Sequence, residues 1–74
     1  MHNSDMVNFK EGLGSRIKGL REGKKLGVRE FALLADIEHH QLINIEKGRV
    51  DMRISTLRKI AGAFSITLSE LVDF

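Results

Sequence analysis

The spacing of apolar residues along the chain predicts helices. Apolar side chains recur at Leu13, Ile17 and Leu20, which places all three on one face of a helix. A second helix is predicted over residues 28–35, and the apolar residues of its inner face are Phe31, Ala32 and Ala35. No segment alternates with a period of two for long enough to predict a strand.

The second half of the chain continues this pattern. A third helix, residues 39–47, buries Leu42 and Ile45 and is closed by Gly48, a residue type that often ends helices. A fourth has apolar residues at positions i, i+3, i+4 and i+7, namely Leu57, Ile60, Ala61 and Phe64. Thr67 and Glu70 form a capping box that opens a fifth, with apolar residues Leu68, Leu71 and Val72. Residues 1–9 are polar and aperiodic, so we expect a flexible tail there and an all-α domain over residues 10–74.

Composition fits one small globular domain. The chain has 74 residues, of which 42% are hydrophobic and 30% charged, so a packed core is expected rather than disorder. Cysteine is absent, which excludes disulfides and thiolate metal sites. The longest apolar run, residues 31–35, is too short to cross a bilayer. We therefore expect a cytoplasmic protein with no membrane association.

The basic residues are concentrated in the middle of the chain. The window from Lys10 to Lys59 holds all 12 Lys and Arg but only seven of the 10 acidic residues, a net charge of +5. The other three acidic residues, Asp5, Glu70 and Asp73, lie outside it. A basic body with acidic ends suits a polyanionic partner, although a solvated helical surface gives a similar distribution.

The sequence offers little for catalysis. The segment Gly12-Leu13-Gly14 lacks a preceding strand and a third glycine, so it is not a dinucleotide-binding loop. His39 and His40 are adjacent and would point about 100° apart on a helix, which disfavours joint metal binding. A domain of this size also has too few residues to enclose a deep active-site pocket. We expect no enzymatic activity, cofactor, metal ion or small-molecule ligand.

Residues 13–74 resemble the helix-turn-helix domain of the Cro and lambda-repressor-like (XRE-like) family. Residues 17–21 (Ile-Lys-Gly-Leu-Arg) are similar to the family's first helix, and residues 26–32 (Leu-Gly-Val-Arg-Glu-Phe-Ala) are similar to its second. Residues 45–49 (Ile-Glu-Lys-Gly-Arg) are similar to the Ile-Glu-Arg-Gly-Lys motif that closes the recognition helix, and residues 57–64 and 68–71 match helices four and five. The resemblance implies a compact five-helix domain that binds double-stranded DNA.

The third helix carries chemistry suited to reading bases. On a helical wheel, Leu42 and Ile45 face away from an outward stripe of His39, His40, Ile43, Asn44 and Lys47. The resemblance implies that this helix enters the major groove with its N-terminal residues at base edges. Asparagine pairs bidentately with adenine, imidazole donates or accepts, and an apolar group contacts the thymine methyl. The candidate base contacts are Glu38, His39, His40, Gln41, Ile43 and Asn44.

Basic residues flank this helix on both sides. Lys and Arg side chains suit phosphates, so the candidate phosphate contacts are Lys24, Lys25, Arg29, Lys47, Arg49 and Arg53. The resemblance further implies a structural ion pair between Arg21 and Glu46, which joins the first helix to the third.

The chain also departs from the family pattern. Val28 stands where the family often has a phosphate-binding Gln, and Glu38 stands where a Ser or Thr would cap the recognition helix. The Glu38 charge would repel phosphates, although it could accept from cytosine N4. Asp36 replaces the usual turn glycine, so we expect it at positive φ. Leu33 and Leu34 occupy positions that are usually polar and exposed, and together with Ile43 they favour a surface for a protein partner, although scattered apolar residues are common on protein surfaces.

These features lead to two hypotheses. The first is a sequence-specific DNA-binding transcriptional regulator, a repressor or controller protein that binds a palindromic operator as a homodimer. Its interface would come from the apolar C-terminal segment, with Ile66, Val72 and Phe74 as candidates, although the same residues could instead complete the core of the monomer. The second is a protein-interaction module or antitoxin with the same fold and weak or partner-dependent DNA binding. The basic window and the polar stripe of the third helix favour the first, whereas Val28, Glu38, Leu33 and Leu34 favour the second.

Overall fold

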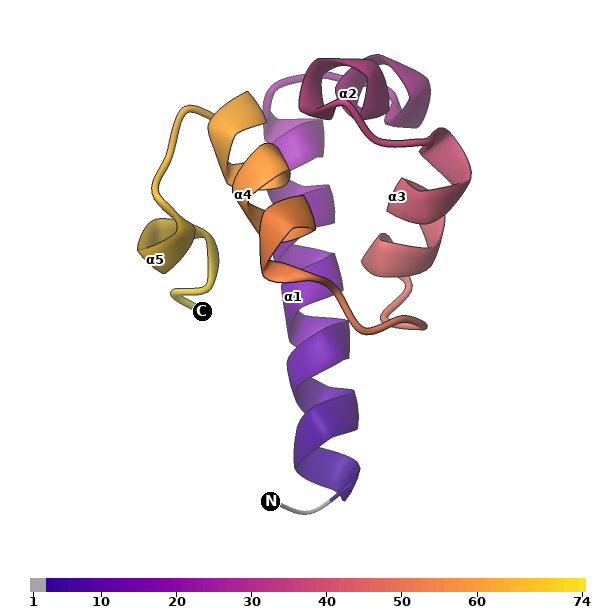
Figure 1. Cartoon of the computed structure of the whole chain (residues 1–74), viewed down its shortest axis with the longest axis vertical. Helices are drawn as coiled ribbons and strands as arrows, with labels where there is room; N and C mark the ends of the chain where they lie inside the picture. Colours follow the sequence, from indigo (N-terminus) through magenta and orange to yellow (C-terminus); the bar gives the residue numbers. More distant parts are fainter. Residues whose placement is uncertain (1–2) are drawn as a thin grey trace.

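The computed structural model describes residues 3–74, which form five α-helices (Figure 1). They are α1 (Asn3–Gly23), α2 (Val28–Ala35), α3 (His39–Glu46), α4 (Ile54–Ala63) and α5 (Leu68–Leu71). No strand occurs within this described range. The predicted all-α, five-helix fold is confirmed, and the bounds of α2 agree with the sequence pattern residue by residue. None of the helices in residues 3–74 combines the length and apolar character needed to cross a membrane.

The other four helices are arranged around the long helix α1 (Figure 1). Figure 1 shows α2 and α3 on one side of α1, α4 in front of it and α5 on the other side. Contacts between helices join α3 to both α1 and α2, and join α4 to α2 and α5. The N-terminal end of α1 projects beyond the other helices (Figure 1). The third helix is therefore supported from two sides, while its remaining face is turned outward.

Every helix contributes to one core. The rings of Phe31 and Phe64 stack near its centre, with centroids 4.3 Å apart and planes 20° from parallel. Burying such large apolar side chains stabilises the fold by about 1.5–3 kcal/mol each. All the inward positions predicted from the helical spacing are buried or half-buried; the fully buried core consists of Leu13, Ile17, Phe31, Ala32, Ala35, Leu42, Ile45, Ile60, Ala61, Phe64 and Leu71.

The flexible tail predicted over residues 1–9 is wrong for its described part. Helix α1 begins at Asn3, so residues 3–9 are helical, and residues 1–2 lie outside the described residues. No glycine or proline interrupts the chain between Asn3 and Glu11. Once residues 13–23 have formed a helix, extension adds one backbone hydrogen bond per residue without a new nucleation step. Phe9 also packs against Phe74, with ring centroids 5.6 Å apart.

Side-chain hydrogen bonds are made at both ends of α5 in the C-terminal segment. The predicted capping box is present: Glu70 N donates to Thr67 Oγ1 at 3.1 Å, and Thr67 N donates to Glu70 Oε1 at 2.9 Å. At the other end, Arg16 of α1 donates to the carbonyl oxygens of Glu70 (3.0 Å) and Leu71 (3.4 Å). These bonds satisfy carbonyl groups that a helix end leaves without partners. They hold α5 against α1.

Candidate nucleic-acid interface

Helix α3 presents a polar face to solvent. Leu42 and Ile45 are buried, at 0% and 1% exposure, where α3 packs on α1 and α2. The rest of the helix surface carries four polar candidates for base contacts, all exposed or half-buried: His39, His40, Gln41 and Asn44. His39, His40 and Asn44 lie on the outward stripe, Gln41 lies beside the buried face, Ile43 is half-buried and Glu38 precedes the helix.

The turn between α2 and α3 depends on Asp36. This residue lies at φ 57° and ψ 48°, so the predicted positive φ is confirmed. Its backbone N–H donates to the Leu33 carbonyl at 3.2 Å, and Ile37 N–H donates to the Ala32 carbonyl at 3.0 Å. Aspartate tolerates this left-handed conformation better than most non-glycine residues. Lys59 of α4 donates to the Asp36 carbonyl at 3.3 Å and fixes the turn from the other side.

The first turn of α3 is formed by Glu38, His39 and His40. Glu38 is the N-cap residue in extended backbone, and its side chain makes no capping hydrogen bond. The imidazole rings of His39 and His40 lie 4.1 Å apart, centroid to centroid, and 36° from parallel. Partial burial lowers the pKa of His39 below its ordinary 6.5, and the nearby His40 and Arg29 lower it further, while Glu38 acts in the opposite direction. Both rings belong to the first turn of α3, the end of the helix that the family resemblance predicts at base edges.

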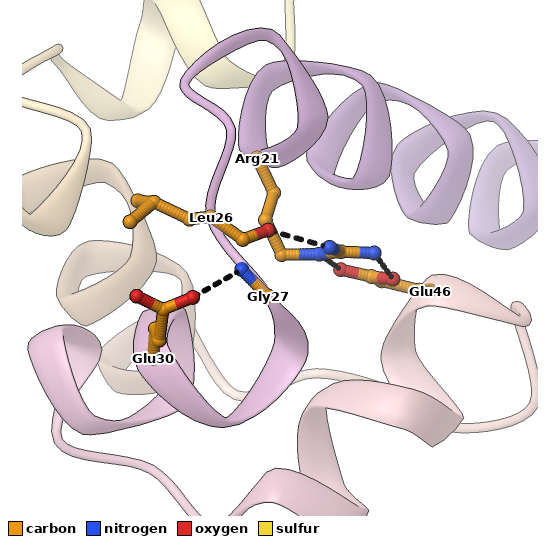
Figure 2. Close-up of polar contacts among 5 residues, drawn as sticks. All are labelled: Arg21, Leu26, Gly27, Glu30 and Glu46. Carbon is orange, nitrogen blue, oxygen red and sulfur yellow. Dashed lines mark hydrogen bonds and ion pairs between the residues drawn. The ribbon is translucent and has the colours of Figure 1, made fainter.

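The C-terminal end of α3 is held to α1 by an ion pair. Arg21 and Glu46 are joined by two hydrogen bonds, Nε to Oε2 at 2.8 Å and Nη2 to Oε1 at 3.0 Å (Figure 2). Arg21 Nη1 also donates to the Leu26 carbonyl at 2.8 Å. The hydrogen bonds to Glu46 raise the pKa of Arg21 above its ordinary value, whereas burial acts against this. This is the pair that the resemblance implied. It links three parts of the chain: α1, α3, and the loop that precedes α2.

The six candidate phosphate contacts are all exposed. Lys24 and Lys25 lie in the turn between α1 and α2, and Arg29 lies in the first turn of α2. The other three follow or precede helix ends: Lys47 and Arg49 at the end of α3, and Arg53 at the start of α4. Other basic residues are used within the fold, since Lys10 pairs with Asp51 at 2.9 Å and Lys59 pairs with Asp36 at 3.5 Å.

A shallow hollow of about 330 Å³ adjoins α3, lined by Lys18, Val28, Ile43, Glu46 and Lys47. Lys18 of α1 was not among the predicted site residues, because its place in this hollow depends on the packing of α1 against α3, which no local sequence pattern encodes. Ile43 is half-buried in this hollow beside Val28, so it is less available to bases than His40 or Gln41. Among residues 7–74, whose side chains the structure describes, no three His, Cys, Asp or Glu side chains gather where they could hold a metal ion.

A family model described as a helix-turn-helix domain matches residues 14–73. The chain belongs to this helix-turn-helix family. The match begins at Gly14, on the part of α1 that contacts α3, and ends at Asp73, two residues beyond α5. In family terms, α2 and α3 are the two helices of the motif and α3 is the recognition helix.

Relatives and solved structures agree with the helix-turn-helix assignment. The immunity repressor protein of Bacillus phage phi105 is 37% identical over 60 residues, which is 81% of this chain and 42% of the repressor. The transcriptional regulator PuuR of Escherichia coli is 36% identical over 62 residues, 81% of this chain and 34% of PuuR. The chain therefore spans less than half the length of these relatives.

Two solved structures resemble this fold, and one of them is of similar size. The restriction-modification controller protein C.AhdI from Aeromonas hydrophila has a TM-score of 0.78 and 28% identity, covering 92% of this chain and 97% of that one. An HTH_3 family transcriptional regulator from Vibrio cholerae has a TM-score of 0.83 and 30% identity, covering 89% of this chain and 37% of that one. The five-helix arrangement of this helix-turn-helix domain is thus found in solved regulators.

The residues singled out as partner surfaces lie in two places on the helix-turn-helix domain. Leu33 and Leu34, near the end of α2, are 84% and 62% exposed. Of the dimer candidates, Ile66 and Val72 are half-buried against the core. Phe74 is 56% exposed, and its ring covers Gly12 of α1. The C-terminal apolar residues therefore serve the monomer in part and leave Phe74 as their most accessible member.

Proposed function

We propose that this helix-turn-helix domain binds double-stranded DNA with sequence selectivity and regulates transcription, as a repressor or controller protein. Base contacts would come from Glu38, His39, His40, Gln41, Ile43 and Asn44 of the recognition helix and its cap. Phosphate contacts would come from Lys24, Lys25, Arg29, Lys47, Arg49 and Arg53, which are exposed around it. No cofactor, metal ion or catalytic residue enters this function.

One observation carries the proposal: the recognition helix is anchored on its apolar face and leaves its polar face free. Leu42, Ile45 and the Arg21–Glu46 pair fix the inner side of α3. His40 and Gln41 are exposed, and Asn44 is half-exposed, on the other side. An asparagine held in this way presents a donor and an acceptor to adenine in the major groove. The names of the phage repressor and the controller protein support the same function.

A salt titration of DNA binding tests this proposal. The chain is titrated onto a labelled random-sequence duplex and binding is followed by fluorescence anisotropy at several salt concentrations. We expect binding at low salt that weakens as salt rises, because Lys and Arg contacts release counterions from the phosphates. Arg29→Gln should weaken binding and lower the salt slope by about one unit. A parent chain that leaves the duplex unbound at low salt would rule out DNA binding.

We also propose that the active form is a homodimer on a palindromic operator. One recognition helix offers few base contacts, whereas two helices about 34 Å apart read half-sites one helical turn apart. Ile66, Val72 and Phe74 form the candidate interface, with Phe74 the most exposed. Phe74 also approaches Phe9, so the N-terminal end of α1 borders this interface.

Sedimentation of the free chain tests the homodimer. Phe74→Asp is a sharper variant than Val72→Asp, because Val72 packs against the core and its loss would disturb folding. The parent is expected as a dimer at micromolar concentration and Phe74→Asp as a monomer. Leu34→Asp is the matched control, since Leu34 is similarly exposed but lies on α2. A monomeric parent would contradict the proposed interface.

The second candidate function is a protein-interaction module or antitoxin with weak or partner-dependent DNA binding. The exposed pair Leu33 and Leu34 favours it, as do Val28 at the start of α2 and the Glu38 charge at the start of α3. This candidate predicts that Leu33→Ser/Leu34→Ser abolishes regulation in cells while DNA affinity stays unchanged. The leading proposal predicts that regulation and DNA affinity both survive this change.

A further inference from the structure

The end of the recognition helix rests directly on the backbone of α1 at Gly14. Gly14 is buried, and a β-carbon placed on it would lie 2.5 Å from the carbonyl oxygens of both Ile45 and Glu46. These oxygens belong to the backbone of the last turn of α3, so no side-chain rotation relieves the overlap. Any larger residue at position 14 must therefore move α3 away from α1.

Two further contacts hold the same end of α3. Gly48, at φ 70°, turns the chain against α1, where a β-carbon would lie 2.9 Å from Glu11 Cα. Glu46 is tied to Arg21 by the bidentate ion pair. The C-terminal end of α3 is thus held along α1 from Glu11 to Arg21. The opposite end, at Glu38, begins without a side-chain cap and is connected through the turn to α2.

We propose that Gly14 is a positioning residue for sequence recognition: because it has no side chain, the recognition helix lies at a short, fixed distance from α1. The inference rests on the proposed DNA-binding function. Gly14 itself contacts no base in this scheme. It acts through the backbone of Ile45 and Glu46, which carry the helix face that includes Asn44.

The geometry gives the size of the effect. Ordinary contact begins at 3.4 Å, so an alanine at position 14 must lift the end of α3 from 2.5 Å by about 0.9 Å. The eight residues of α3 span about 12 Å, so lifting one end tilts the helix by about 4°. Base recognition requires side chains to be held within about 0.5 Å of their productive positions. At Asn44, close to the lifted end, the displacement is about 0.6 Å, which is enough to weaken its base contact, whereas the residues near Glu38 move less.

The tilt should leave part of the phosphate surface in place. Lys24, Lys25 and Arg29 lie in the α1–α2 turn and on α2, so they do not move with α3. Sequence-independent binding depends on such phosphate contacts, whereas selectivity depends on base edges. Loss of selectivity with retained salt dependence is the result that a general loss of stability would not give.

The test compares Gly14→Ala with Gly19→Ala, a matched glycine in the same helix whose added methyl would meet nothing within 4 Å. Both changes favour the helical backbone. Affinity is measured for a duplex selected by the parent chain and for a scrambled duplex, at several salt concentrations, with thermal melts of each variant. Gly14→Ala should lower the selectivity ratio by about ten-fold or more and keep at least the part of the salt slope on scrambled DNA that Lys24, Lys25 and Arg29 supply. Gly19→Ala should match the parent in both.

A stabilised background covers the case in which Gly14→Ala does not fold. Gly19→Ala/Gly62→Ala adds two helix-favouring substitutions at positions with no neighbour within 4 Å, and Gly14→Ala is repeated there. A folded Gly14→Ala variant with parental selectivity would overturn the inference. So would failure to fold in both backgrounds, since Gly14 would then be required for folding itself. A parent chain without selectivity would instead contradict the proposed function.

Discussion

Removing Glu46 should destabilise this domain strongly. The Arg21 and Glu46 side chains are only 8% and 7% exposed, so Glu46→Ala leaves a guanidinium buried with one remaining bond, to the Leu26 carbonyl. Breaking a buried ion pair by removing one partner costs about 3–5 kcal/mol. At about 0.05–0.15 kcal/mol per residue, a chain of this length has a total stability of about 4–11 kcal/mol. The single substitution therefore removes a large share of it.

Thermal melting followed by circular dichroism measures this loss. For a domain of this size 1 kcal/mol corresponds to about 4–8 °C, so Glu46→Ala should lower Tm by at least about 12 °C. Glu38→Ala is the control, because the Glu38 side chain is exposed and makes no capping bond; it should change stability by less than about 0.5 kcal/mol. The double variant Arg21→Met/Glu46→Leu should recover much of the loss, since no buried charge remains unpaired. A Glu46→Ala melt within about 2 °C of the parent would refute the argument.

Three further predictions concern the interface. Asn44→Ala should cost about 1–3 kcal/mol of binding free energy and remove the preference at one base pair, whereas Arg49→Ala should weaken binding to all sequences alike. Affinities for duplexes with single base changes, measured at several salt concentrations, distinguish these two effects. Asp36→Gly should leave Tm nearly unchanged, because glycine adopts φ 57° without strain, whereas Asp36→Val should lower Tm. Equal Tm values for the two variants would contradict a turn that requires positive φ at this position. Because the pKa of His39 lies below 6.5 in the folded chain, stability should be full above pH 6.5 and fall as pH drops through the folded pKa. His39→Gln should reduce this dependence of the free energy of unfolding on pH, measured by denaturant titration. An unchanged dependence in the variant would show that another group causes it.

Most of the fold was predictable because its helices are marked by local signals. The spacing of Leu57, Ile60, Ala61 and Phe64 and the Thr67–Glu70 capping box each act within one or two turns, and they placed α4 and α5 correctly. The start of α1 was not predictable in this way. Residues 3–9 lack apolar periodicity, and their helix follows from extension of the segment that comes after them.

The candidate interface was predictable only in part, because its geometry depends on contacts between distant residues. The outward stripe of α3 followed from helix periodicity, and the Arg21–Glu46 pair followed from the family resemblance. The contact of Gly14 with the backbone of Ile45 and Glu46 joins residues about thirty positions apart, and no local pattern encodes it. A glycine within a helix is usually unfavourable, and only the structure supplies the packing reason.

Selection of bound sites from a random DNA pool tests sequence-specific recognition by α3. We expect enrichment of sites with two inverted half-sites, their centres about 10–10.5 base pairs apart, and loss of preference at one position of each half-site in Asn44→Ala. A pool that shows no enrichment after repeated rounds, although the chain binds duplex DNA in a salt-dependent way, would contradict sequence-specific recognition by α3.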